Sequence, residues 1–98
     1  MHYLLFYDLV DDYMERRVPL RPAHLSYARE AVERGELLLG GALANPPDTA
    51  VLLFHSDSPS IVESFARNDP YVIAGLVSGW RIREWTTVVG PGAAVRVP

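Results

Sequence analysis

The hydrophobic and polar positions of this chain predict four strands. Residues 2–10, HYLLFYDLV, are apolar at nearly every position, which is typical of a strand covered on both faces. One face would carry Leu4 and Phe6, and the other Tyr3, Leu5, Tyr7 and Leu9. Residues 36–44 and 49–56 flank the turn sequence NPPD and predict a hairpin. A last strand is expected at residues 80–89.

Two segments have the spacing of amphipathic helices. The first would have Pro22 in its first turn and stop at Gly35, with an apolar stripe of Leu25, Ala28 and Val32. The second begins near residues 58–60, where Ser58 could act as the cap or Ser60 and Glu63 could form a capping box. Its buried side is expected to carry Ile61, Val62, Phe65 and Ala66. Pro70 would end this helix, and Asp69 could cap the short turn that follows.

The resulting order is βαββαβ, which predicts an α+β ferredoxin-like fold: a four-stranded antiparallel sheet with two helices on one face. We expect this domain to span residues 1–89, followed by a tail at 90–98 that is either a loosely held arm or a strand crossing to a partner. In this topology the first helix starts at the edge of the fold where the second helix ends. His24 and Asp69 should therefore lie at the same edge.

Composition narrows the classes of function. The chain has 98 residues, enough for one domain, and its net charge of −3 argues against a nucleic-acid partner. It has no cysteine, which excludes thiolate chemistry. No run of 18 apolar residues and no basic leader are present, so a cytoplasmic protein without membrane contact is expected. His2 and His55 are expected at the edge opposite His24, so no metal site is predicted, and no phosphate-binding motif indicates a cofactor.

His24 and Asp69 are the candidate catalytic pair. A histidine oriented by a carboxylate can act as a general base or acid, which contributes typically 10²- to 10⁴-fold to a rate. Near a helix N-terminus the dipole disfavours the imidazolium form, whereas a nearby carboxylate favours it. Spacing alone is equally compatible with a structural role, in which Asp69 is a cap and His24 is hydrogen-bonded at a helix start.

Four further residues near the same edge are candidate substrate contacts. Arg17 and Arg21 could bind a carboxylate or phenolate, or could instead pair with neighbouring acidic residues. Tyr71 could donate a hydrogen bond to a ligand or only pack. Asp8 could steady an arginine, contact substrate or cap a loop.

Several of these elements together resemble the YCII-related domain proteins. The resemblance rests on Arg17, Arg21, His24 and Leu25 in the pattern RxxxRxxHL, on GELLLGGAL, and on NDPYVIAGL followed by a strand that contains tryptophan. It covers residues 1–89 and implies a homodimer of the dimeric α+β barrel type. It also implies that His24 and Asp69 are the catalytic pair, and that the chemistry is proton transfer, including dehydrochlorination of hydroxyquinol-type rings.

Three hypotheses for function follow. The first is a cofactor-free lyase or isomerase acting on a small, aromatic or ring-oxygenated acid. The second is a noncatalytic dimeric module that binds a small molecule, and the third is a cofactor-independent oxygenase. The sequence does not identify the substrate.

Overall fold

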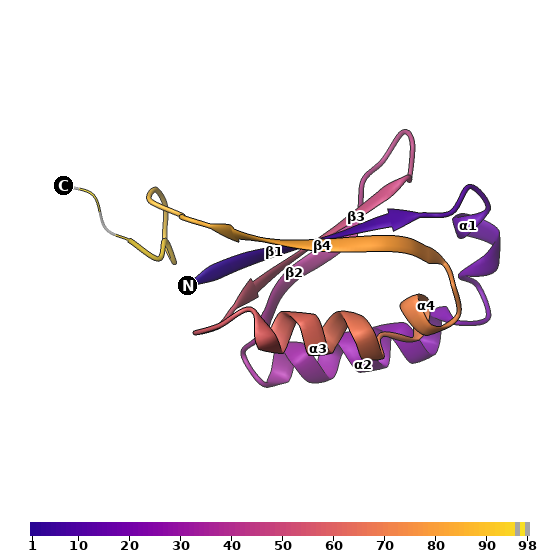
Figure 1. Cartoon of the computed structure of the whole chain (residues 1–98), viewed down its shortest axis with the longest axis horizontal. Helices are drawn as coiled ribbons and strands as arrows, with labels where there is room; N and C mark the ends of the chain where they lie inside the picture. Colours follow the sequence, from indigo (N-terminus) through magenta and orange to yellow (C-terminus); the bar gives the residue numbers. More distant parts are fainter. Residues whose placement is uncertain (96, 98) are drawn as a thin grey trace.

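The computed structural model describes residues 1–95 and 97 and contains four strands and four helices. In chain order the elements are β1 His2–Leu9, α1 Tyr13–Arg16, α2 Arg21–Glu33, β2 Leu37–Ala42, β3 Thr49–His55, α3 Ser60–Asn68, α4 Pro70–Ile73 and β4 Val77–Trp85. The order of the long elements is the predicted βαββαβ. The short helices α1 and α4 are insertions at one edge of this arrangement (Figure 1).

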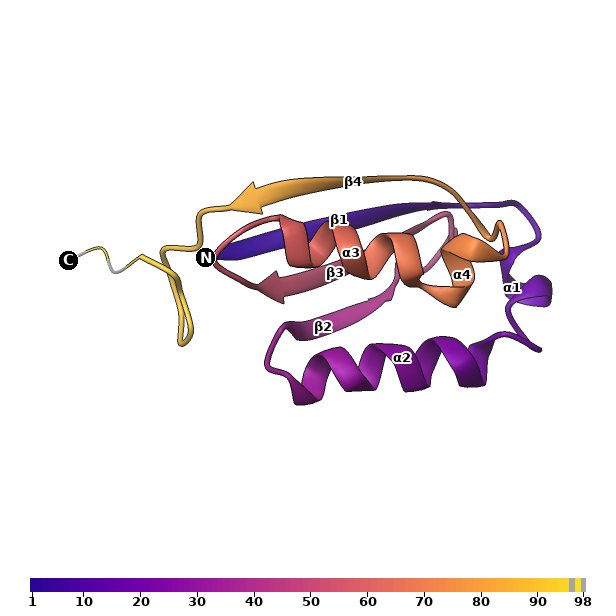
Figure 2. The same cartoon turned by 60° about the horizontal axis from the view of Figure 1, so that its bottom comes forward.

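The four strands form one antiparallel sheet in the order β2-β3-β1-β4. The helices α2 and α3 run side by side along one face of this sheet, and α4 lies at the edge of the fold where α2 begins and α3 ends (Figures 1 and 2). The predicted α+β ferredoxin-like fold is therefore confirmed. Because β1 is a central strand between β3 and β4, every backbone group along it can pair within the sheet.

The core lies between the sheet and the helices. Strand β1 alternates as predicted, with Tyr3, Leu5, Tyr7 and Leu9 buried toward the helices. They meet Phe54 from β3 and Phe65 from α3, whose rings lie 5.0 Å apart. The other face of the sheet, which carries Leu4 and Phe6, is only half-buried in the single chain.

Helix α2 is rotated relative to its predicted orientation. The residue that it buries completely is Ala31, whereas Val32 from the predicted stripe is 50% exposed. Leu25, Ala28 and Val32 line an open cavity between α2 and β2, and Ala28 also packs against the core. Within the predicted stripe, Ala28 therefore contacts the core, whereas Val32 does not.

Three details of the other elements also differ from expectation. Neither predicted cap of α3 forms, because Ser58 Oγ and Ser60 Oγ bond to each other at 2.7 Å and no side chain caps the helix. Ile61 is 39% exposed, so only Val62, Phe65 and Ala66 form the buried side of α3. Strand β4 runs from Val77 to Trp85, so it both begins and ends earlier than the predicted residues 80–89.

Beyond β4 the chain makes a turn that is fixed at its base. The amide of Val95 donates to the carbonyl of Thr87, and the amide of Ala94 donates to Thr87 Oγ1. Thr87 Oγ1 also lies 2.6 Å from Nδ1 of His2, so the turn is held at the start of β1. Of the predicted tail at 90–98, Arg96 and Pro98 lie outside the described residues. In the part of the chain described, no helix is long and apolar enough to cross a bilayer.

Candidate active site

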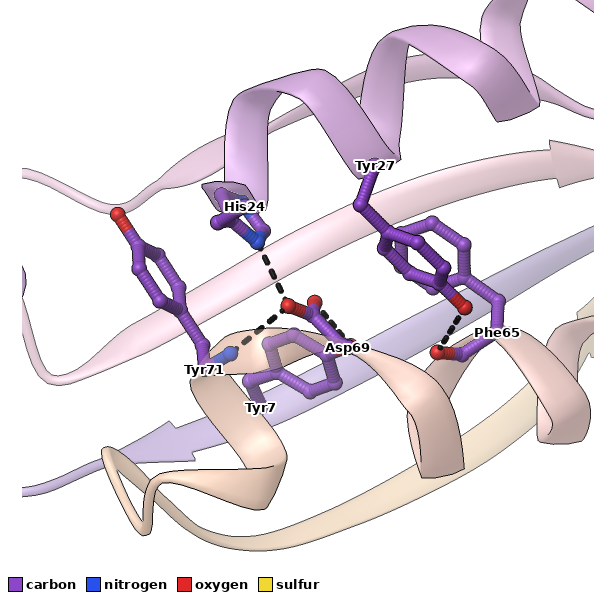
Figure 3. A network of polar contacts seen from close by, with 6 residues as sticks. All are labelled: Tyr7, His24, Tyr27, Phe65, Asp69 and Tyr71. Atoms are coloured by element: carbon purple, nitrogen blue, oxygen red, sulfur yellow. Dashed lines mark hydrogen bonds and ion pairs between the residues drawn. The ribbon is translucent and has the colours of Figure 1, made fainter. Parts of the chain in front are cut away.

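His24 and Asp69, which are 45 positions apart, are in direct contact. His24 lies in the first turn of α2, and Asp69 lies at the junction of α3 and α4. His24 Nδ1 is 2.7 Å from Asp69 Oδ1 (Figure 3). The topology was expected to bring these two residues to one edge of the fold, and it does so.

Local sequence fixes the conformation of Asp69. Pro70 disfavours helical geometry at the preceding residue, and Asp69 is extended, with φ −67° and ψ 126°. Its side chain turns back over the new helix and accepts a hydrogen bond from the amide of Tyr71 at 3.0 Å. The predicted cap is confirmed. The same cap presents the carboxylate to His24.

Asp69 is fully buried, and donors surround its carboxylate. Oδ1 accepts from the Tyr71 amide and contacts His24 Nδ1, while Oδ2 accepts from the Tyr7 hydroxyl at 2.8 Å. A carboxylate has only acceptor sites, so this arrangement favours the tautomer in which Nδ1 of His24 carries the proton. Nε2 is then the ring nitrogen that is left to accept a proton from another molecule.

Aromatic side chains hold the imidazole ring from the other side. The ring of Tyr71 stacks on that of His24, with centroids 3.8 Å apart and an interplanar angle of 8°. Tyr13 from α1 meets Tyr71 edge-on, and the guanidinium of Arg17 lies 5.4 Å from the centre of the Tyr13 ring. His24 is thus held between a carboxylate and a ring, and its side chain is only 15% exposed.

A cavity of about 350 Å³ lies between α2 and the edge strand β2, and His24 forms part of its wall. Volumes in this range are typical of small-molecule sites. Two cations and two phenols also line the cavity near the imidazole: Arg17, Arg21, Tyr13 and Tyr71. Arg16 pairs with Asp12 at 3.7 Å, which leaves Arg17 and Arg21 to face the cavity.

Burial raises the pKa of Tyr71 to about 12, and Tyr13 and Asp69 add to this shift. Arg21 and Arg17 act in the opposite direction, because positive charge favours the phenolate. Burial, reinforced by the Asp69 carboxylate, also raises the pKa of Tyr7. Both phenols remain protonated at neutral pH, and the Tyr7 hydroxyl donates to Asp69.

The structure does not bring Asp8 to this site. Asp8 follows Tyr7 on β1 and so points to the opposite face of the sheet. There its carboxylate lies 3.5 Å from Arg81, and its backbone carbonyl accepts from Ser78. Of the three roles predicted for Asp8, the structure therefore shows the pairing with an arginine.

The other histidines lie far from His24, as expected. His2 and His55 are paired across β1 and β3 at the opposite edge of the sheet. Their ring centroids are 5.8 Å apart. Among the described residues, no group of three or more potential ligand side chains could hold a metal ion.

Two residues at the site were not predicted. Tyr7 was identified only as a core residue, although its hydroxyl donates to Asp69. Tyr13 was assigned no role because α1 was not predicted. The polar atom of Tyr7 was the available signal, since a buried phenol usually needs a hydrogen-bond partner.

The chain is similar to several known proteins in sequence. A family model described as the YCII-related domain matches residues 1–86. "Derivative of benzaldehyde biosynthesis cluster protein C" from Emericella nidulans is 36% identical over 75 residues, which are 66% of this chain and 76% of that protein. Protein YciI from Escherichia coli is 29% identical over 97 residues, covering 90% of this chain and 99% of that protein.

One solved structure has the same fold. It is 5-chloro-2-hydroxyhydroquinone dehydrochlorinase (TftG) from Burkholderia phenoliruptrix, in complex with 2,5-dihydroxybenzoquinone. The TM-score is 0.74 at 22% identity, over 89% of this chain and 95% of that chain. At this level of identity the likeness establishes the fold, and at least one protein with this fold is an enzyme.

Proposed function

The chain belongs to the YCII-related domain family, and from this premise we propose that it is a cofactor-free enzyme that moves a proton on a small ring-oxygenated acid. The reaction class would be that of a lyase or an isomerase. The observation that carries the proposal is the contact of 2.7 Å between His24 Nδ1 and the fully buried Asp69, at the wall of a cavity.

His24 is the proposed general base and acid. Nε2 would accept a proton from a ring hydroxyl or an acidic ring carbon, and the imidazolium formed would be stabilised by the carboxylate bonded to Nδ1. In a lyase the electron pair released to the ring expels a leaving group as an anion. In an isomerase the same proton returns at another ring position. Asp69 orients the imidazole and does not itself exchange a proton with substrate.

Arg17, Arg21 and Tyr71 are the proposed substrate contacts. Two guanidinium groups at one end of the cavity suit a carboxylate or a phenolate, and the protonated phenol of Tyr71 suits a ring oxygen. The structural neighbour bound to 2,5-dihydroxybenzoquinone supports a ring-oxygenated ligand as the first class to test.

A second copy of the chain is the proposed partner. The sheet face away from the helices carries a half-buried apolar patch, which consists of Leu4, Phe6, Val51 and Leu53. A standard interface of about 800 Å² per partner would cover such a patch. Val51→Asp should give monomers in light scattering after size exclusion, whereas Ile73→Asp on α4 should not. Monomers for wild-type protein would contradict the dimer.

The proposed chemistry is tested with hydroxylated aromatic acids that stabilise the protein in a thermal-shift screen. Ligands so found are incubated in deuterated buffer, and exchange or conversion is followed by NMR. His24→Ala should fold normally and lose about 10²- to 10⁴-fold in rate. His55→Ala is the matched control, because His55 is exposed at the opposite edge. Turnover by His24→Ala at the wild-type rate would overturn the proposal. Binding without any chemistry would instead make the protein a binding module.

A further inference from the structure

The cavity beside His24 is longer than a single ring requires. It follows α2 from Arg21 to Val32, three turns of helix, or about 16 Å at 1.5 Å per residue. A cavity of about 150 Å³ is sufficient for benzene, whereas this one has about 350 Å³. Once a ring lies against His24, more than half of the volume remains.

The two ends of the cavity differ in polarity. The polar end carries Arg17, Arg21 and His24. Strand β2 runs antiparallel to α2, so Leu37 and Leu38 at its start lie near Val32 at the end of the helix (Figure 2). The far end is therefore mainly apolar, with Val32, Leu37 and Leu38 in its walls and Arg29, one turn before Val32, as its charged residue.

Gly40 lies midway along the β2 wall. It pairs with Leu52 on β3, and a Cβ added there would point toward the helices, 3.4 Å from Leu52 Cγ and 3.9 Å from Leu37 Cδ1. These are ordinary contact distances, so a side chain at this position could be accommodated by the fold. It would, however, occupy the passage between the polar end and the apolar end.

We infer that the substrate is a hydroxylated aromatic acid with an apolar substituent of several carbons, which extends past Gly40 toward Val32. The polar end of this inference rests on the proposed function. Gly40 is then the residue that determines how long a substituent can be. The absence of a side chain at Gly40 keeps the cavity continuous.

The test compares 2-hydroxybenzoate with 2-hydroxy-6-pentylbenzoate by calorimetry. The two probes share their charge and hydroxyl and differ only in the alkyl chain. Each buried methylene strengthens binding about fourfold, so with half of the chain's surface covered, five carbons should give roughly 30-fold tighter binding. Gly40→Val should lower this preference to less than about threefold, with the affinity for 2-hydroxybenzoate changed less than about twofold.

Gly41→Val is the matched control. Gly41 also lines the cavity, but it pairs with Val51, whose side chain lies on the other face of the sheet, so an added side chain would point away from the cavity, and its Cβ would meet nothing within 4 Å. Its preference for the pentyl probe should equal that of wild type. Equal binding of both probes, an unchanged preference in Gly40→Val, or no binding of either probe at millimolar concentration would overturn the inference. A change in oligomeric mass caused by Gly40→Val would also overturn it, because a second copy would then occupy the groove.

This experiment can fail independently of the proposed function. It measures binding, so the alkyl preference should persist in His24→Ala. Full turnover by His24→Ala would overturn the proposed chemistry and leave the preference standing. If His24→Ala loses turnover as expected but the wild-type protein shows no alkyl preference, the proposed chemistry stands and the inference about the substituent is overturned.

Discussion

The hydrogen bond from Tyr7 to Asp69 should make an unusually large contribution to stability for a single hydroxyl group. Tyr7→Phe removes one oxygen and leaves the buried ring in place. Asp69 Oδ2 then loses the donor that lies 2.8 Å away, and Asp69 has no exposed surface through which water could replace it. The perturbation therefore leaves one oxygen of a buried carboxylate without a partner.

The chain offers a matched comparison. Tyr27 donates to the carbonyl of Phe65, also at 2.8 Å, but this acceptor is neutral. Hydrogen bonds to charged groups contribute about 1.5–3 kcal/mol, and neutral ones about 1 kcal/mol. We expect Tyr7→Phe to lower the free energy of unfolding by about 2–3 kcal/mol, and Tyr27→Phe by about 1 kcal/mol.

Urea unfolding followed by circular dichroism measures both values, at one protein concentration so that association does not differ between variants. For a domain of 98 residues, a loss of about 2 kcal/mol lowers Tm by roughly 8–16 °C. Equal losses for the two variants would refute the reasoning, because they would show that Oδ2 is not acting as a charged acceptor.

Three further outcomes are expected. Arg17→Gln should weaken binding of 2-hydroxybenzoate about three- to tenfold but leave the neutral 2-hydroxybenzamide unaffected; equal losses in calorimetry would remove the proposed charge contact. Burial, with His55 and the N-terminus, lowers the pKa of His2 below 6.5, so the unfolded chain binds the proton first and stability decreases as pH falls below 6.5. His2→Gln should flatten this part of the Tm profile between pH 7 and 5, and parallel profiles would exclude His2 as its source. Burial raises the pKa of Tyr71 to about 12, so the contribution of the Tyr71 phenol to folding stability is complete below pH 10 and is lost as pH rises through 12. Tyr71→Phe should remove a phenolate that appears in ultraviolet titration only near pH 12. An unchanged titration curve would contradict this assignment.

The fold could be predicted because period and order determine it. The alternation in β1 and the spacing of apolar residues in α2 and α3 identify the elements, and βαββαβ order permits few arrangements. The contact between His24 and Asp69 followed from the same topology, since helix ends at one edge of a sheet must lie near one another.

The rotation of α2 was not available from its sequence. Apolar residues occupy two neighbouring stripes, one through Ala31 and one through Val32, and adjacent positions differ by about 100° around a helix. Packing on the sheet selects Ala31, which leaves Val32 for the cavity. The pattern of a single helix cannot distinguish the stripe that faces a core from the stripe that faces a cavity.

The role of Tyr7 was hidden for a related reason. Its hydroxyl reaches Asp69 only because β1 and the end of α3 are in a particular register. The failed caps of α3 show the same limit, because Ser58 and Ser60 bond to each other instead of to the backbone. Choices between two nearby hydrogen-bond partners depend on tertiary packing.

The central claim is that Asp69 holds His24 with the proton on Nδ1, so that Nε2 is free to accept one. Long-range ¹H–¹⁵N correlation spectra of the histidine side chains, recorded in alkaline buffer, distinguish the two neutral tautomers, and His24→Ala assigns the signals. We expect His24 to show a protonated Nδ1 and an unprotonated Nε2, and Asp69→Asn to alter that pattern. A proton on Nε2, with Nδ1 unprotonated, would contradict the account.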